Sequence, residues 1–194
     1  MNLPAFRAQE LTELSGLVSA EVGLRLADLA YDVPRLRAIV EIGSFRGKST
    51  CYLAEGARLG GNAHVWAVDP WNLPGNPTGK HGFAEAETWK AFIAQVHGMS
   101  LDEYITPIQD FSIRAAEKWD GPPVGLLYID GSHTYTDVRA DYEAWEKHLA
   151  PRATVVFDDY DTKRNPGVKE YVDELREPFD FDTDTPPLAI RVLR

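Results

Sequence analysis

Apolar side chains recur at steps of three and four residues near the start of the chain, at Leu11, Leu14, Val18, Val22, Leu26 and Leu29. This spacing indicates an amphipathic helix, because one helical turn takes 3.6 residues. The pattern predicts an N-terminal helical segment over residues 1–34, with its helix ending near the sequence YDVP, where proline disfavours continuation. We expect the apolar stripe of this helix to pack on a sheet.

Five short apolar runs follow, separated by segments long enough for helices. They read AIVEIG, HVWAVD, YITPIQD, VGLLYID and ATVVFDD. Such alternation is typical of a parallel α/β sheet. After the fifth run, PGVKEYVDELRE predicts a helix, and DFDTDTPPLAIRVLR predicts a last strand or hairpin with Pro186 and Pro187 in its turn. Each run ends at an acid or a glycine, on the edge where open α/β sheets bind their ligands.

The composition bounds the function classes. With 194 residues, 44% of them hydrophobic, the chain can bury one sizeable core, so we expect a single domain over 1–194. The net charge of −10 argues against nucleic acid or a membrane surface as partner, because phosphate groups would be repelled. There is one cysteine, Cys51, and neither a signal peptide nor a membrane span is expected. We therefore expect a cytoplasmic protein that binds small molecules.

One segment carries no periodicity at all. The sequence DPWNLPGNPTGKHG, from Asp69 to Gly82, holds three prolines and three glycines. It predicts a loop or lid over residues 70–84, because long loops on a rigid scaffold often cover sites.

The first apolar run leads into a glycine-rich turn, EIGSFRGKST. Its lysine comes one position too early for a Walker phosphate loop, and Phe45 and Lys48 replace two glycines of a dinucleotide fingerprint. Gly43 and Gly47 still allow a ligand close to the backbone, at the start of a helix whose amides attract a carboxylate or phosphate. A purely structural two-glycine turn remains an equal alternative.

Neighbouring polar residues favour the ligand-binding alternative. Ser49 can add a hydroxyl donor, and Asp69, at the end of the second run, can accept both hydroxyls of a ribose. Glu41, inside the first strand, argues against a nucleoside triphosphate and suits a cationic cofactor. A nucleoside-containing cofactor is therefore expected.

Three acids follow the fourth and fifth runs, which we expect to be neighbouring strands. Asp130, Asp158 and Asp159 would converge there and repel one another unless a cation neutralises them, and all-oxygen ligation suits Mg²⁺. His133, three residues after Asp130, is then positioned as a general base, since imidazole exchanges protons near neutral pH. The competing interpretation makes these acids loop and helix-capping residues and His133 a surface residue.

The glycine turn with its acid resembles the first motif of class I methyltransferases that use S-adenosylmethionine. The resemblance implies a Rossmann-like, doubly wound, mostly parallel seven-stranded sheet with its last strand antiparallel. It implies that Gly43, Gly47 and Ser49 hold the methionine part, that Asp69 holds the ribose and that Asp110, in IQDFS, lies near the adenine. Glu41, Ser44 and Asp130 complete the expected cofactor site.

The segment from DGSH to DDYD, within residues 38–178, resembles a narrower group, the metal-dependent O-methyltransferases that act on macrolide sugars and, more distantly, on catechols. This likeness implies Mg²⁺ held by Asp130 and the acidic pair Asp158 and Asp159, and methyl transfer to one of two vicinal hydroxyls of a sugar or natural-product scaffold. An additional N-terminal domain like that of the sugar enzymes is not expected, and the acceptor pocket is therefore expected to be more open or completed by a second subunit in a homodimer.

Three alternatives remain open from the sequence. A nucleoside triphosphatase would use Lys48 on phosphate and Asp130 on the metal, which the shortened loop disfavours. A second alternative is a non-catalytic module that binds S-adenosylmethionine or a metal, because fold does not settle activity. A third keeps the cofactor and metal but supports another tailoring reaction, such as hydroxylation.

Overall fold

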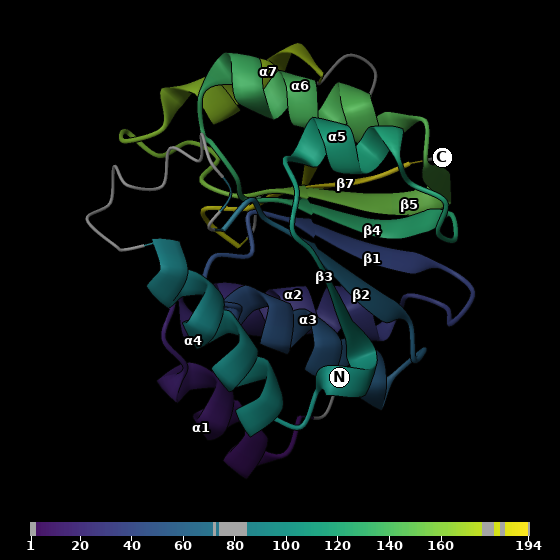
Figure 1. Ribbon diagram of the computed structural model, residues 1–194. Coiled ribbons are helices and arrows are strands. Elements are labelled where there is room, and N and C mark those ends of the chain that lie inside the picture. Colours follow the sequence, from purple (N-terminus) through teal and green to yellow (C-terminus); the bar gives the residue numbers. More distant parts are fainter. Residues whose placement is uncertain (1–2, 72, 74–84, 176–180, 183–184, 194) are drawn as a thin grey trace.

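The computed structural model describes residues 3–71, 73, 85–175, 181–182 and 185–193. Its strands form one sheet in the order β3-β2-β1-β4-β5-β7-β6 (Figure 1). The strands are β1 (Ala38–Ile42), β2 (His64–Val68), β3 (Ile105–Ile108), β4 (Val124–Ile129), β5 (Leu149–Phe157), β6 (Phe181–Asp182) and β7 (Ala189–Val192). The first five are parallel, and β7 runs antiparallel to β5 and β6. The predicted Rossmann-like α/β fold, with an antiparallel last strand, is confirmed.

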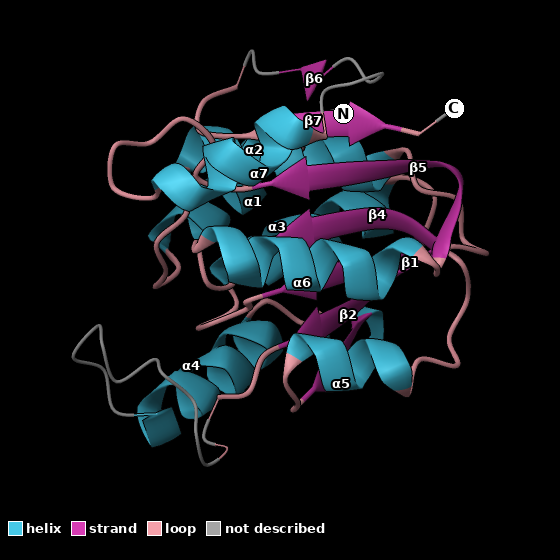
Figure 2. Cartoon of the chain, turned by 90° about the horizontal axis from the view of Figure 1, so that it is seen from above, coloured by secondary structure: helices cyan, strands magenta, loops and turns pink. Residues whose placement is uncertain are grey.

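Helices cover both faces of the sheet. Figure 1 shows α5, α6 and α7 on one face and α1 to α4 on the other, and the view from above in Figure 2 shows α6 lying along the strands. The helices are α1 (Ala5–Glu13), α2 (Ala20–Tyr31), α3 (Lys48–Leu59), α4 (Glu85–Gly98), the short 3-10 helix η2 (Asp102–Tyr104), α5 (Ser112–Glu117), α6 (Tyr135–Glu146) and α7 (Pro166–Glu174). Among the described residues, no helix has the length and apolar character needed to cross a membrane.

Each face of the sheet has its own hydrophobic core. On the α1–α4 face, Leu26, Tyr52 and Leu53 are fully buried beneath the strands. On the α5–α7 face, Trp145 and Phe157 are fully buried. Side chains of β1 alternate between these layers, and all five positions of that strand are buried, as expected for a central parallel strand.

The prediction of one continuous N-terminal helix is wrong. The chain forms α1 and α2 instead, since Leu14 is extended at φ −60° and ψ 145°. Ser19 then starts α2, and its hydroxyl accepts the Val22 N–H at 3.2 Å. The apolar spacing continues across the break, so a prediction from periodicity alone gave one helix. The structure has two, and Ser19 caps the second.

Backbone hydrogen bonds align the ends of the five parallel strands. The N–H groups of four residues that directly follow strands each donate to the last carbonyl of a neighbouring strand: Asp69 to Ile108, Gly43 to Val68, Asp130 to Ile42 and Asp158 to Ile129, at 2.9–3.2 Å. All four residues are predicted site residues, and they therefore form one row along the edge of the sheet, which we call the strand-end row.

The C-terminal hairpin and the lid have different outcomes. A turn at Pro186 and Pro187 precedes β7, which confirms the predicted last hairpin. Of the predicted loop or lid at 70–84, almost all lies outside the described residues.

Candidate active site

The two glycines of the turn have conformations and surroundings that exclude a side chain. Gly43 has φ +89°, and a Cβ there would lie 2.2 Å from the carbonyl oxygen of Asp130. Gly47 has φ +88°, and a Cβ there would lie 2.8 Å from the ring of Phe92. The end of β1 is therefore packed directly on the end of β4, and helix α3 begins immediately after the turn.

Asp69 holds the glycine turn in place. Its two carboxylate oxygens accept the backbone N–H groups of Phe45, at 2.9 Å, and Trp71, at 2.6 Å. Burial raises the pKa of Asp69, while these two hydrogen bonds oppose the rise. Because a carboxylate offers about four acceptor positions, the predicted contact with ribose hydroxyls remains compatible with this role and stays a prediction.

A buried polar cluster lies beneath the turn. Glu41 is fully buried, and Thr50 donates its hydroxyl to Glu41 Oε2. Burial raises the pKa of Glu41, and the nearby hydroxyls of Ser49 and Thr50 oppose the rise. Within the described part of the chain, Glu41 Oε1 and the Ser44 hydroxyl have no hydrogen-bond partner. An unpaired buried polar atom costs about 1–3 kcal/mol, so these atoms suit a bound polar group at the turn.

Asp110 is engaged by the helix that follows it. Its carboxylate accepts the Phe111 N–H at 2.8 Å and pairs with Arg114 at 2.6 Å and Lys118 at 2.8 Å. Although burial acts to raise it, the hydrogen bonds from Lys118, Phe111 and Arg114 lower the pKa of Asp110. The expected place near an adenine is untested, and the structure adds a local role at the start of α5.

The predicted convergence of acids at the ends of β4 and β5 is present. One ligand atom each from Asp130, His133 and Asp158 lie within 4.8 Å of one another. Nε2 of His133 is 3.2 Å from Asp130 Oδ1, and the Tyr128 hydroxyl donates to Asp130 Oδ2 at 3.2 Å. We call Asp130, His133 and Asp158 the acidic cluster.

The carboxyl groups of Asp130 and Asp158 would repel each other if both were ionised. Burial raises the pKa of Asp130 to about 8. Burial, followed by the charges of Asp130 and Asp159, raises the pKa of Asp158 to about 9. Asp158 Oδ1 is buried and has no partner among the described residues. A divalent cation would offset the repulsion and occupy this oxygen, so the residues present fit a metal ion with oxygen ligands.

Asp159 lies differently from the expected ligand set. Its backbone has φ +56°, its Oδ2 accepts the Asn165 side-chain amide, and the same oxygen is 3.5 Å from His133 Nδ1. The acidic cluster contains His133, whereas the sequence predicted Asp159 as the third member. Consecutive residues point to different sides of the chain, and the left-handed backbone turns the Asp159 carboxylate toward the imidazole. The predicted ligand role of Asp159 and base role of His133 remain predictions.

Sequence reasoning missed three residues that support the site. Thr50 donates to Glu41, Tyr128 donates to Asp130, and Asn165 holds Asp159. Tyr128 had a visible signal, because it lies two positions before Asp130 and residues with that spacing share a face of a strand. Asn165 had no such signal, because it lies in an irregular turn and the sequence does not show that this turn brings it back to Asp159.

Comparisons with solved structures confirm the fold. An O-methyltransferase from Bacillus cereus in complex with SAH has a TM-score of 0.69 at 16% identity, covering 99% of this chain and 92% of the other. CalS11, a TDP-rhamnose 3'-O-methyltransferase in calicheamicin biosynthesis, has a TM-score of 0.64 at 16% identity, covering 98% and 81%.

Sequence relatives are longer than this chain. The uncharacterized protein y4gI of Sinorhizobium fredii is 32% identical over 143 residues, which are 73% of this chain and 15% of y4gI. The uncharacterized protein R132 of Acanthamoeba polyphaga mimivirus is 26% identical over 138 residues, which are 70% of this chain and 58% of R132. The chain thus spans less than two thirds of either relative. The family described as "Methyltransferase domain" matches residues 40–160, and the chain belongs to this family.

Proposed function

We propose that the protein transfers the methyl group of S-adenosylmethionine to a hydroxyl oxygen of a small molecule, assisted by Mg²⁺ or another hard divalent cation. The observation that carries the proposal is the contact between the glycine turn and the acidic cluster. Gly43 packs on the carbonyl of Asp130, and the Asp130 N–H donates to Ile42 at 2.9 Å. A cofactor on the turn and an acceptor at the cluster would therefore be neighbours.

The glycine turn would hold the cofactor. Gly43 and Gly47 allow close approach to the backbone, and the first amides of α3 attract the cofactor's carboxylate. Ser44 and Ser49 supply hydroxyls, and Glu41 suits a cationic ligand. Asp69 would contact the ribose and Asp110 would lie near the adenine. Bound S-adenosylmethionine supplies an electrophilic methyl group on a sulfonium centre.

The ends of β4 and β5 would hold the cation through Asp130, Asp158 and Asp159, which leaves His133 as the base. A bound divalent cation lowers the pKa of a coordinated hydroxyl and orients it. As the methyl group moved from the sulfonium to the acceptor oxygen, the imidazole of His133 would accept the proton that the hydroxyl loses. Asp130 Oδ1, 3.2 Å from Nε2, and Asp159 Oδ2, 3.5 Å from Nδ1, would stabilise the resulting imidazolium.

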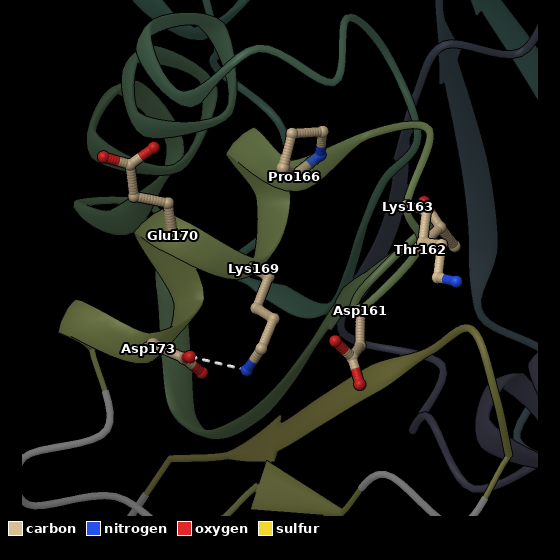
Figure 3. Close-up of a pocket in the computed structure, with 7 residues that line it drawn as sticks. All are labelled: Asp161, Thr162, Lys163, Pro166, Lys169, Glu170 and Asp173. Atoms are coloured by element: carbon tan, nitrogen blue, oxygen red, sulfur yellow. Dashed lines mark hydrogen bonds and ion pairs between the residues drawn. The ribbon is translucent and has the colours of Figure 1, made fainter.

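An open pocket with charged side chains in its lining is the candidate position for the rest of the acceptor. It has a volume of ≈ 440 Å³ and lies between the turn after β5 and helix α7 (Figure 3). Its charged lining residues are Asp161, Lys163, Lys169, Glu170 and Asp173. Carboxylates accept hydrogen bonds and ammonium groups donate them, and a sugar hydroxyl does both.

The turn that lines the pocket follows Asp158 and Asp159 directly in the sequence. The Thr162 hydroxyl donates to the Asp159 carbonyl at 3.2 Å, and Lys169 donates to Asp173 at 2.6 Å across the pocket wall (Figure 3). An acceptor carrying vicinal hydroxyls is therefore proposed to place those hydroxyls at the cluster and its remainder in this pocket. The action of CalS11 on TDP-rhamnose is consistent with that choice.

A titration tests the proposal directly. The purified protein is stripped with EDTA and titrated calorimetrically with S-adenosylmethionine, without and with Mg²⁺. Binding supports the cofactor assignment, and transfer of a labelled methyl group to a panel of sugars and catechols then tests the reaction. Absence of binding under both conditions would overturn the methyltransferase proposal. Binding without transfer to any member of the panel would favour the non-catalytic module, and transfer that does not require Mg²⁺ would overturn the role of the metal alone.

A further inference from the structure

The segment between α1 and α2 lies against the glycine turn. The Lys48 ammonium donates to the Thr12 carbonyl at 3.0 Å, and the Arg46 guanidinium donates to the Ser15 hydroxyl at 2.8 Å. A Cβ at Gly16 would lie 2.5 Å from the Lys48 Cβ. Residues 12–16, which we call the N-terminal strap, thus touch the residues that end the turn and begin α3.

One side-chain amide joins the strap to the turn. Gln95, on α4, donates through Nε2 to the Arg46 carbonyl at 2.6 Å and to the Ser15 carbonyl at 3.1 Å. Its Oε1 accepts the Ser15 N–H at 2.5 Å. Gln95 therefore connects three segments that are far apart in the sequence.

The Gln95 contact fixes a peptide inside the turn. The Arg46 carbonyl and the Gly47 N–H belong to the same peptide plane. The carbonyl accepts from Gln95, and the N–H donates to the Ser44 carbonyl at 2.7 Å. With both ends bonded, this plane cannot rotate freely, and its orientation sets the direction of the first amides of α3.

Both flanks of Gln95 are anchored by other contacts. On α4, Phe92 packs against Gly47 and stacks on Trp89, with ring centroids 5.9 Å apart and planes 7° apart. On α1, Arg7 pairs with the buried Glu55 of α3 at 3.0 Å. The amide therefore links two firmly held elements across the turn.

We infer that Gln95 is a positioning residue of the cofactor site and that it couples the N-terminal strap to cofactor binding. The inference rests on the proposed function. Cofactor that binds the turn selects the peptide orientation that Gln95 stabilises. By linkage, the cofactor then stabilises the docked strap as much as the strap stabilises bound cofactor.

Two variants of matched chemistry test the inference. Gln95→Ala removes the linking amide, whereas Gln9→Ala removes an exposed amide of α1 that donates to Glu13 at 2.9 Å. We expect Gln95→Ala to raise the Kd for S-adenosylmethionine about tenfold, within the usual range of coupling between sites, and to raise KM for the cofactor with kcat unchanged. Gln9→Ala should bind as the wild type does.

Hydrogen exchange gives a readout that a merely structural role would not change. In the wild type, S-adenosylhomocysteine should slow exchange of the Ser15 amide. Gln95→Glu keeps an oxygen that accepts the Ser15 N–H but loses the donor to the Arg46 carbonyl, so this cofactor-dependent slowing should be lost in that variant. If Gln95→Ala fails to fold, Gln95→Glu also replaces it in the affinity measurements, and the same rise in Kd is expected.

The outcomes separate this inference from the proposed function. If the wild type binds the cofactor and a folded Gln95 variant has the same Kd, the inference alone is overturned. The same holds if the wild type binds the cofactor but the Ser15 amide gains no protection from it. A wild type that binds neither S-adenosylmethionine nor S-adenosylhomocysteine would overturn the proposed function and this inference with it.

Discussion

Replacement of Gly43 by alanine should disrupt the junction between the glycine turn and the acidic cluster. The new methyl group would lie 2.2 Å from the Asp130 carbonyl oxygen and 2.6 Å from its carbonyl carbon. Both are backbone atoms, so no side-chain rotation relieves the overlap. The ends of β1 and β4 would have to move apart.

The cost has two parts. Alanine at φ +89° adds about 1–2 kcal/mol for the left-handed backbone. Forcing a methyl group into a packed site adds about 1–3 kcal/mol. The free energy of unfolding should therefore fall by about 2–5 kcal/mol, and cofactor binding should be lost because the turn no longer meets β4.

Urea denaturation and cofactor titration measure these two effects. Gly98→Ala is the matched control, because a Cβ at the end of α4 meets no atom within 4 Å. Alanine is the better helix former, so this control should be unchanged or more stable by up to about 1 kcal/mol. A Gly43→Ala protein as stable as wild type, with unchanged cofactor affinity, would refute the packing of β1 on β4.

Three further predictions concern single side chains. His133→Ala should lower kcat by about 10²–10⁴ with cofactor affinity retained, while His97→Ala, whose side chain is 81% exposed, should leave turnover unchanged in the same assay. Asp158→Asn should weaken Mg²⁺ binding at least about tenfold in calorimetry, and unchanged Mg²⁺ affinity would exclude Asp158 as a ligand. The variant should also stabilise the metal-free protein at pH 7, because burial raises the pKa of Asp158 to about 9 and its carboxyl must take up a proton on folding, whereas asparagine is neutral in both states. Glu55 has a pKa that burial tends to raise but that the guanidinium groups of Arg58 and Arg7 lower to about 2, so its stabilisation is complete above pH 4.5 and lost as the pH falls toward 2. The fall of the Glu55 pKa from 4.5 to about 2 corresponds to about 3 kcal/mol of stability. Glu55→Gln should abolish that part of the acid dependence in denaturation curves at pH 7 and pH 3.

The strands could be predicted from sequence because their environment leaves a strong pattern. Central strands such as β1 and β4 are buried on both faces, and they read as short apolar runs, interrupted in β1 by Glu41. The N-terminal segment was harder, since α1 and α2 have apolar positions in nearly the same period. Residues 14–19 separate them, from the extended Leu14 to the Ser19 cap, and this short segment keeps the apolar spacing at Leu14 and Val18.

The site was predictable as far as strand topology determines it. Asp130 and Asp158 follow adjacent parallel strands, so their approach follows from strand order alone. The direction of the Asp159 side chain depends on a left-handed backbone φ of 56°, which residue spacing in the sequence does not predict. Likewise, the bonds of Asp69 to Phe45 and Trp71 depend on how the turn folds back, and the sequence showed only that an acid follows a strand.

The strand-end row holds the glycine turn and the acidic cluster in a fixed position relative to each other. Gly43, Asp130 and Asp158 are held by backbone hydrogen bonds of 2.9–3.0 Å to neighbouring strands, not by their side chains. Side-chain changes such as Asp158→Asn therefore alter charge and ligation without moving the row. Gly43→Ala acts on the backbone contact itself, and so it should disturb both binding sites at once. Measuring cofactor and Mg²⁺ affinity in the two variants distinguishes these cases: Asp158→Asn should weaken only Mg²⁺ binding, and equal loss of both ligands in it would show that the side chain, and not the sheet register, positions the site.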